Sequence, residues 1–424
     1  MKKISALVDG IKRLFKGGFF HILTGNVLNK AVAMISSVVV ARIVDKVSYA
    51  HLSYADNIYS YITLFSGLGM ASALLKFCSA DNDKEKDVAY LKFAYKVGGG
   101  FELAAAIIAC IALTVFEIPY AGARVFAWML VLYPLFSYFI STNSIYMRTQ
   151  LDNQKYAGVG VAFSVFSCVF SIIGILTLGT NGIVAGRYLA VLLVFLYTAI
   201  YVRKKTKGHN EIKLSSKEKK AFFSMGISLA MANFFSGIMP LNEVFLVNNI
   251  IRDETISANF RVAGLIPQML LLVSGAVTVY YFPIVARLKN GKEIKAKVLQ
   301  IAIINFAVVG VIALVGALLT PLALDILYSG KYNDAVSISY VLWLMRTANC
   351  AVRYVPMNML PAIGKTKFNL VTAIISCVAQ CGLDYFFINK FGIIGVAYGA
   401  IIVYIASGIG YWVYFMHCTK KDIT

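Results

Sequence analysis

The sequence predicts an all-α integral membrane protein with about twelve transmembrane helices, and three observations support this fold class. First, 59% of the 424 residues are hydrophobic and only 14% are charged, whereas soluble domains average about 45–50% and about 25%. Second, apolar runs of about 20 residues, the length that crosses a bilayer, recur along the whole chain. Third, the alternating pattern of membrane β-strands is absent from these runs.

The apolar runs define the individual elements. Backbone groups in lipid must be satisfied within the segment itself, so each run is expected to be a helix. Cutting at charged or Gly/Pro-rich positions gives the spans 19–43, 47–75, 93–115, 124–147, 157–178, 183–202, 221–250, 256–285, 298–320, 336–362, 368–388 and 391–416. The segment before the first span is basic and amphipathic. The run after it is too long for a signal peptide and has no clear cleavage site, so we expect it to remain a membrane helix.

The distribution of the net charge of +20 along the chain indicates how these spans are oriented in the membrane. Twelve spans put both termini on one side of the membrane. That side holds 28 of the 40 basic residues, and the opposite side holds eight. The positive-inside rule therefore places both termini in the cytoplasm. Most of the charge is thus explained by topology and gives no support to nucleic-acid binding. The basic residues of the cytoplasmic side lie in the segments 1–18, 76–92, 148–156, 203–220, 286–297, 363–368 and 417–424.

An internal repeat relates the two halves of the chain. The segment that starts at Lys155 resembles the one that starts at Lys365, with Gly182 opposite Gly392, an offset of 210 residues. An offset of six helices preserves orientation, so we predict two parallel six-helix repeats, 1–210 and 211–424. Matching small-xxx-small patterns, Gly182/Gly186 and Gly395/Gly399, indicate close packing of helices.

Cysteine and histidine give no evidence of a metal site. The seven cysteines are scattered through apolar runs, and no two of the four histidines have the spacing of metal ligands. The sequence therefore predicts no metal and no bound cofactor.

Ionisable residues within membrane helices are costly and commonly face a cavity or a partner. In the tenth span, Arg346, Asn349 and Arg353 recur at i, i+3 and i+7, so a straight helix would place them on one face. Arginine suits phosphate because its planar fork gives two hydrogen bonds and keeps its charge. We therefore expect a cationic stripe that recognises an anion.

Further polar residues extend the predicted cavity. Asn26 and Lys30 share a face of the first span, and Asn233 lies at the repeat offset of 207 from Asn26. Arg42 and Arg261, near span ends, complete the predicted set of cavity residues. Asp56 and Glu243 are the carboxylates expected to titrate or to pair with these cations. Lys96, Glu102 and Asp384 lie near predicted span boundaries, where neutralising pairs or snorkelling chains are the simpler interpretation. Pro134, Pro240, Pro267 and Pro356 fall inside spans and allow bending.

Several segments then carry a family resemblance. One segment, residues 41–77, resembles the first two helices of the polysaccharide transporter family. Its sequence is ARIVDKVSYAHLSYADNIYSYITLFSGLGMASALLKF, and the resemblance is carried by Arg42, Tyr49, Gly67 and Gly69. A second segment, residues 245–288, is similar to that family's seventh and eighth helices and has a proline, Pro283, where the eighth helix ends. Its sequence is FLVNNIIRDETISANFRVAGLIPQMLLLVSGAVTVYYFPIVARL. A later segment, TPLALDILYSGKYNDAVSISYVLWL, resembles a family loop through Gly330, Tyr332 and Ala335. The chain departs from the family at Asn242-Glu243, where an Asp is common, and at Phe260-Arg261, where a Tyr is common.

This resemblance is to the O-antigen flippase (Wzx-type) branch of the MATE-like flippase superfamily. It implies a V-shaped bundle of two six-helix halves around a central cavity, in the bacterial inner membrane. It also implies alternating-access flipping of an undecaprenyl-diphosphate-linked oligosaccharide from the cytoplasmic to the periplasmic leaflet, for O-antigen, capsule or exopolysaccharide synthesis. Expected partners are this lipid, membrane lipids, a polysaccharide polymerase and a chain-length regulator. Coupling to a proton or sodium gradient is the expected energy source.

Two alternatives stay open. The first is an ion-coupled drug antiporter of the same superfamily, which should favour acidic cavity residues for cationic drugs; Arg346 and Arg353 argue against it. The second is a membrane enzyme of glycan assembly. Such enzymes need an external catalytic surface, and here the longest outer loop, around Lys331, has about 15 residues without paired carboxylates at catalytic spacing. We therefore predict no catalytic residues.

Overall fold

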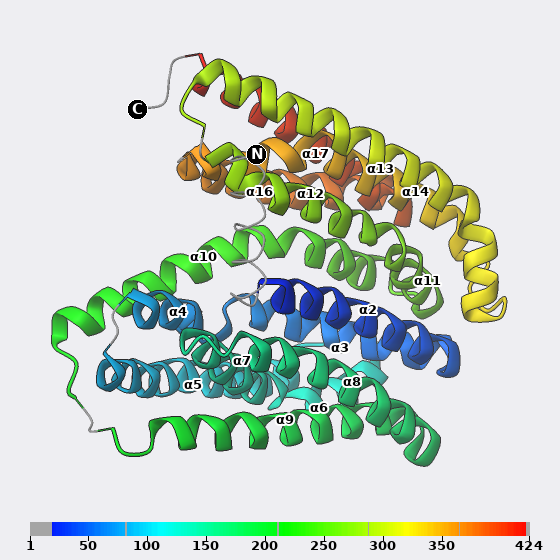
Figure 1. Cartoon of the computed structure of the whole chain (residues 1–424). Coiled ribbons are helices and arrows are strands. Elements are labelled where there is room, and N and C mark those ends of the chain that lie inside the picture. The colour runs from blue at the N-terminus through cyan, green and yellow to red at the C-terminus, as the bar shows by residue number, and fades with distance from the viewer. Residues whose placement is uncertain (1–18, 81–82, 210–211, 287, 364, 421–424) are drawn as a thin grey trace. The chain divides into compact units, whose positions relative to one another are not determined.

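The computed structural model describes residues 19–80, 83–209, 212–286, 288–363 and 365–420, and every element in them is helical (Figure 1). Side chains are not described at 19–27, 79, 80, 232, 233, 236, 279, 283, 286 and 366. The long helices of the first half are α2 (Phe19–Ile43), α3 (Lys46–Leu64), α4 (Met70–Ala80), α5 (Lys84–Val115), α6 (Ala121–Leu130), α7 (Tyr133–Thr149), α8 (Asn153–Leu178) and α9 (Gly182–Thr206). They are followed by α10 (Ser216–Leu246), α11 (Glu254–Leu265), α12 (Leu270–Ala286), α13 (Gly291–Tyr328), α14 (Ala335–Ala348), α15 (Tyr354–Met359), α16 (Thr366–Phe391) and α17 (Ile393–Cys418).

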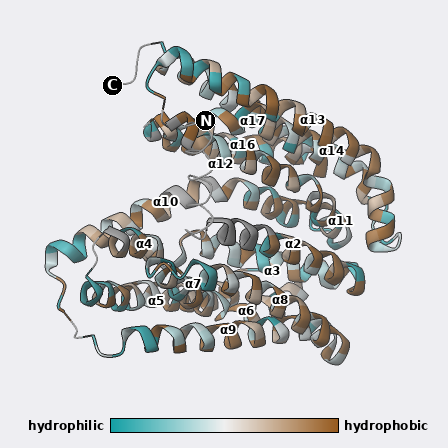
Figure 2. Ribbon diagram, in the orientation of Figure 1, coloured by the Kyte–Doolittle hydropathy of each residue, from teal (hydrophilic) through white to brown (hydrophobic). Residues whose placement is uncertain are grey.

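The predicted fold class, an all-α integral membrane protein, is confirmed. Within the described residues, nine helical segments are long and apolar enough to cross a membrane. One of them, Asn153–Thr206, contains both α8 and α9, which are two of the predicted spans. The first and seventh predicted spans correspond to α2 and α10, and Gly237–Ile251 forms a shorter apolar helix. Hydrophobic residues cover most of α9 and α13, while hydrophilic residues gather at the end of α9 and the start of α10 (Figure 2).

Four predicted spans are broken helices. The second span divides into α3 and α4 at the turn η1 (Ser66–Gly69), and the eighth divides into α11 and α12 at η4 (Pro267–Met269). The fourth span divides into α6 and α7 beside Pro134. The tenth divides into α14 and α15 at the π-helical turn η5 (Asn349–Arg353). The second and fourth spans of each half are therefore the interrupted ones, as the repeat requires.

The described chain forms two compact units, Met1–Phe234 and Phe235–Thr424. This division falls within α10, so that one helix contributes its first part to the first unit and its last part to the second. The predicted halves, 1–210 and 211–424, stay a prediction about the repeat.

The core of each unit consists of side chains from helices that are distant in sequence. In the first unit, Leu74, Leu91 and Phe222 bring α4, α5 and α10 together and are at most 2% exposed. In the second, Ile301 and Phe415 join α13 to α17 and are fully buried.

Close helix packing in the repeat follows from its glycines, as predicted. A Cβ added at Gly182 would lie 1.9 Å from the carbonyl oxygen of Gly174, and one at Gly395 would lie 2.1 Å from that of Phe387. Only glycine allows the backbones of α8 and α9, and of α16 and α17, to approach this closely.

The geometry of these turns corrects the repeat offset. Gly179 ends α8 with φ 65° and ψ −154°, and Gly392 ends α16 with φ 64° and ψ −149°. This region of φ is open mainly to glycine. Gly179 is therefore the counterpart of Gly392, and the offset is 213 residues. The expected match of Gly182 with Gly392 was wrong by about one helical turn, since Gly182 is equivalent to Gly395.

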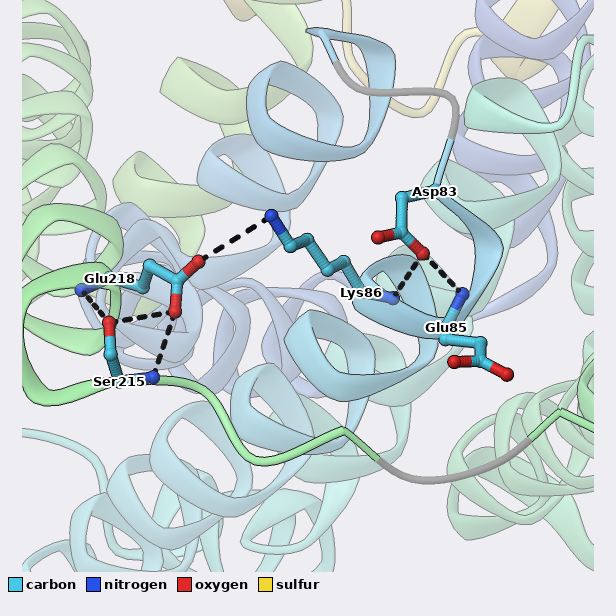
Figure 3. Close-up of polar contacts among 5 residues, drawn as sticks. All are labelled: Asp83, Glu85, Lys86, Ser215 and Glu218. Atoms are coloured by element: carbon cyan, nitrogen blue, oxygen red, sulfur yellow. Dashed lines mark hydrogen bonds and ion pairs between the residues drawn. The ribbon is translucent and has the colours of Figure 1, made fainter.

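Polar side chains fix the starts of α5 and α10 in the first unit (Figure 3). The Asp83 carboxylate accepts hydrogen bonds from the backbone N–H groups of Glu85 and Lys86. Ser215 and Glu218 form a capping box, in which each side chain accepts a hydrogen bond from the other residue's N–H. The Ser215 N–H holds the pKa of the Glu218 carboxyl below its usual range. Lys86 Nζ lies 3.8 Å from Glu218 Oε1, which links the two helix starts.

The repeat packing predicts that Gly182→Ala lowers stability. The added methyl group would overlap the Gly174 carbonyl, and overpacking of this kind costs about 1–3 kcal/mol. The thermal unfolding midpoint of the purified protein in detergent should fall by several degrees. Gly158→Ala is the matched control, because that α8 position is exposed and has no neighbour within 4 Å. Equal midpoints in the two variants would contradict the packing role.

Candidate functional site

The second unit contains a buried polar cluster around Glu243 on α10, whose side chain is 2% exposed. Arg346 Nη2, on α14, donates to Glu243 Oε2 at 3.0 Å. Gln380 Nε2, on α16, and the Tyr404 hydroxyl, on α17, both donate to Oε1 at 3.2 Å. Four helices thus supply one carboxylate and its three donors. We call Glu243, Arg346, Gln380 and Tyr404 the Glu243 cluster.

Hydrogen bonding decides whether such a charge can be buried. A buried carboxylate is tolerated only when it is both paired and hydrogen-bonded. Glu243 satisfies this condition, since both of its oxygens accept at least one bond. The predicted pairing of Glu243 with a cation of the stripe is therefore observed, and its partner is Arg346.

Arg353 adds a second cation beside the cluster. Its guanidinium lies over the rings of Tyr404, at 5.5 Å, and Tyr411, at 6.0 Å. The residue is 8% exposed, and its Nε has no hydrogen-bond partner among the described residues. The described ion pairs include none for Arg353, and its guanidinium contacts two tyrosine side chains. The two arginines of the predicted stripe thus differ: Arg346 is neutralised by a carboxylate, and Arg353 has no carboxylate partner among the described ion pairs.

The π-helical turn η5 positions Arg353. A π-turn interrupts the regular helical bonds and must be stabilised by other donors. Asn305 Nδ2, on α13, donates to the Cys350 carbonyl at 2.8 Å. Trp412 Nε1, on α17, donates to the Val352 carbonyl at 3.0 Å. The predicted straight helical face is therefore replaced by a turn that two neighbouring helices hold in place.

Asp384 on α16 is a second buried carboxyl group in this unit. It is fully buried, one turn beyond Gln380, and neither oxygen has a hydrogen-bond partner among the described residues. Gly399 makes room for it, since a Cβ there would lie 2.3 Å from Asp384 Oδ1. The expectation of a neutralised or snorkelling residue near a span end was wrong. A buried carboxyl without partners is instead a candidate site for a proton or a small cation.

Glu102 on α5, in the first unit, was also expected to be a neutralised or snorkelling residue near a span end, and this expectation was wrong. It is 1% exposed, and its Oε1 accepts a hydrogen bond of 2.8 Å from the backbone N–H of Gly67. Gly67 and Leu68 break the second span with φ of 52° and 51°. A left-handed conformation costs a residue such as Leu about 1–2 kcal/mol. Glu102 therefore stabilises a strained break in a membrane helix.

Asp56 on α3 pairs with Arg187 on α9, also in the first unit. The contact is bidentate, with Nη1–Oδ1 at 2.6 Å and Nη2–Oδ2 at 3.0 Å. The side chains are 32% and 21% exposed, respectively. Asp56 thus pairs with Arg187, which is not one of the predicted cavity cations.

The structure places the other predicted cavity residues outside the Glu243 cluster. Asn349 lies in η5 and is buried, and its Oδ1 has no partner among the described residues. Lys30 and Arg42 are exposed on α2, and Arg261 is half-buried on α11. The side chains of Asn26 and Asn233 lie outside the described ones, as does the amphipathic segment 1–18. The assignment of Asn26 and Asn233 to a cavity stays a prediction.

The functional residues that sequence reasoning missed are Gln380, Tyr404 and Tyr411. Gln380 and Asp384 do carry a signal, since they are polar and one turn apart in an apolar span. The tyrosines carry none, because this chain has 25 of them.

The comparison with protein families agrees with this architecture. A family model described as "Polysaccharide biosynthesis protein" matches residues 15–289, more than half of the chain. The chain belongs to the polysaccharide biosynthesis protein family. This family member is also 26% identical, over 294 residues, to a Shigella flexneri protein named "Putative O-antigen transporter". That match covers 66% of this chain and 68% of the Shigella flexneri protein.

Solved structures confirm the fold of this polysaccharide biosynthesis protein. An inward-facing multidrug resistance transporter of the MATE family superposes with a TM-score of 0.74 at 15% identity, over 92% of this chain and 94% of that one. A transporter of the MOP superfamily from Pyrococcus furiosus gives a TM-score of 0.66 at 16% identity, over 95% of each chain. The predicted MATE-like fold is thereby confirmed, and family and fold together indicate a transporter.

The Glu243–Arg346 pair predicts a strong effect on stability. Glu243→Gln should destabilise the protein by about 3–5 kcal/mol, because Arg346 is left as a buried charge. Glu243→Gln combined with Arg346→Gln should recover part of this loss. Asp56→Asn, in the more exposed pair, should cost less, about 1 kcal/mol. Unfolding of the wild type, these three variants and the single variant Arg346→Gln in mixed micelles measures these differences. An additive double variant would show that the two side chains do not interact.

Proposed function

We propose that this family member flips an undecaprenyl-diphosphate-linked oligosaccharide from the cytoplasmic to the periplasmic leaflet by alternating access. The family and the O-antigen transporter relative support this cargo class. The observation that carries the proposal is Arg353, a buried guanidinium that contacts aromatic rings and has no described carboxylate partner. A diphosphate offers bidentate acceptors to such a group.

The Glu243 cluster would couple this transport to an ion gradient. Arg346 is held by Glu243 in the present state. Protonation of Glu243, or binding of sodium to it, would weaken that pair and release Arg346 toward an anionic cargo. Asp384 is the neighbouring carboxyl that could accept the proton or the cation. One buried charge pair would in this way link cargo binding to the ion.

The remaining features of the proposal follow from charge and family. The basic segments 203–220 and 286–297 favour a cytoplasmic side that also holds both termini, in the bacterial inner membrane. A polysaccharide polymerase and a chain-length regulator are the proposed protein partners. The protein would act as a transporter without catalysing covalent chemistry.

An ion-coupled drug antiporter is the second candidate. The buried carboxyl of Asp384, together with the fold shared with MATE transporters, favours it, because cationic drugs require acidic partners. The two candidates differ in the sign of the cargo's charge, so one reconstitution distinguishes them.

The flippase proposal predicts that Arg353→Gln slows transport. Losing a charge-assisted bond to phosphate costs about 1.5–3 kcal/mol, which corresponds to a rate about 10–100-fold lower. The measurement is reorientation of a fluorescent undecaprenyl-diphosphate glycan in proteoliposomes. Lys390→Gln is the control, since Lys390 is an exposed cation at the end of α16. Export of ethidium without glycan reorientation would instead establish the drug antiporter.

The coupling proposal predicts that Glu243→Gln removes the dependence of transport on external pH or sodium. The amide cannot release a proton and binds Arg346 without charge. Asp56→Asn tests the other predicted carboxylate in the same assay, and exposed Glu117→Gln is the control. Unchanged pH and sodium profiles in the Glu243 and Asp56 variants would exclude both residues from coupling.

A further inference from the structure

We propose that a cavity between α5, α7 and α9, in the first unit, binds the phosphate headgroup of an anionic membrane phospholipid. The cavity has a volume of about 640 Å³. Its lining includes three cations, Lys92, Lys96 and Arg203, and contains no acidic residue. It shares no residue with the Glu243 cluster, which belongs to the other unit.

The three cations lie at a suitable depth for a lipid phosphate. Lys92 and Lys96 are one turn apart on α5, so they lie on one face of it. At 1.5 Å per residue they are about 12 and about 18 Å from the start of α5 at Lys84. Arg203 is in the last turn of α9. Long cationic side chains at such positions reach toward the headgroup level.

The sign of the charge selects an anion on one side of the membrane. The end of α9 leads into the basic segment 203–220, which the positive-inside rule assigns to the cytoplasm. The segment 76–92 at the start of α5 holds four basic and four acidic residues. Basic pockets between membrane helices on that side are suited to anionic headgroups, since each Lys or Arg near the surface contributes about 1 kcal/mol.

The inner end of the cavity is polar but already satisfied. Tyr95 donates its hydroxyl hydrogen bond to Asn143 Oδ1, and Asn143 Nδ2 donates to Thr198 Oγ1 at 3.1 Å. Asn143 is 1% exposed. The amide therefore braces α5, α7 and α9 around the cavity.

The rest of the lining suits an acyl chain. Phe139 and Phe195 form an aromatic wall, with ring centroids 6.1 Å apart. Beside the lining residues of α9, Leu196 and Ile200 are 54% and 55% exposed, as expected for side chains that face lipid tails. A phospholipid could thus enter sideways, with its phosphate at the cations and a chain along the aromatic wall. Free phosphate would use only the first of these contacts.

The test measures lipid binding to the purified full-length protein by native mass spectrometry. The probes are dioleoylphosphatidylglycerol and the zwitterionic dioleoylphosphatidylcholine. Phosphatidylglycerol should bind at least tenfold more tightly than phosphatidylcholine. The combined variant Lys92→Gln, Lys96→Gln and Arg203→Gln should weaken its binding at least tenfold.

Two further variants distinguish binding in the cavity from nonspecific attraction between the basic protein and an anionic lipid. Lys204→Gln, Lys292→Gln and Lys295→Gln together remove three exposed cations that do not line the cavity, and should change binding less than threefold. Ala199→Phe fills the cavity and keeps every charge, so it should weaken phosphatidylglycerol binding as strongly as the triple charge variant. This steric variant also keeps the proposal testable if the charge variant fails to fold.

Four outcomes would overturn the proposal. Equal losses in the cavity and control triples would indicate nonspecific attraction, and unchanged binding in Ala199→Phe would exclude the cavity. Displacement of the lipid by inorganic phosphate at equal concentration would indicate a simple anion site. Displacement by undecaprenyl diphosphate at equal concentration, with no preference for phosphatidylglycerol, would assign the cavity to the cargo.

Discussion

One constraint governs this structure: inside a bilayer, each polar group of the backbone needs a partner supplied by the protein. Wherever a helix is interrupted, another helix must provide that partner. Glu102 does so for the N–H of Gly67, and Asn305 and Trp412 do so for the carbonyls of η5. The buried polar side chains and the helix breaks are therefore parts of one arrangement. The candidate site lies at such a break, since Arg346 is in the last turn of α14 and Arg353 is in η5.

Charge is subject to the same constraint. Glu243 is buried because Arg346, Gln380 and Tyr404 all donate to it, whereas Arg353 has aromatic faces in place of an anion. The site is consequently asymmetric, with one charge compensated and one not. The proposed flippase mechanism uses this asymmetry, with an anionic cargo at Arg353 and a proton or cation at the carboxylates.

Hydropathy was sufficient to predict the helices, since crossing a bilayer requires a long apolar run. It could not predict the break at η1, because the sequence Ser66–Gly69 is compatible with a helix until Glu102 and Tyr138 pack around it. Pro134 and Pro267 did signal two of the other breaks. The π-turn depends on Asn305 and Trp412, which lie 45 and 60 residues from the carbonyls they bind. No local pattern contains that information.

Only part of the candidate site could be predicted from the sequence. Charges within apolar runs identified Arg346, Arg353 and Glu243, because charge is rare there and its cost is high. Glu102 and Asp384 were wrongly predicted to be neutralised or snorkelling because they lie near span ends. Position along a helix does not determine which face of the helix is buried. Arg187 could not be predicted as the partner of Asp56, because the two residues lie 131 positions apart on different helices.

The offset of 213 residues allows the two helix pairs, α8–α9 and α16–α17, to be compared position by position. Position 384 corresponds to position 171, where a serine, 2% exposed, stands in place of the carboxylate. Gln380 and Tyr404 correspond to Ser167 and Val191, which carry no comparable group. The packing glycines therefore occur in both copies of this helix pair, whereas the polar residues differ. Where α17 has Ala400, α9 carries Arg187, which pairs with Asp56, so each copy has an ionisable residue that the other lacks.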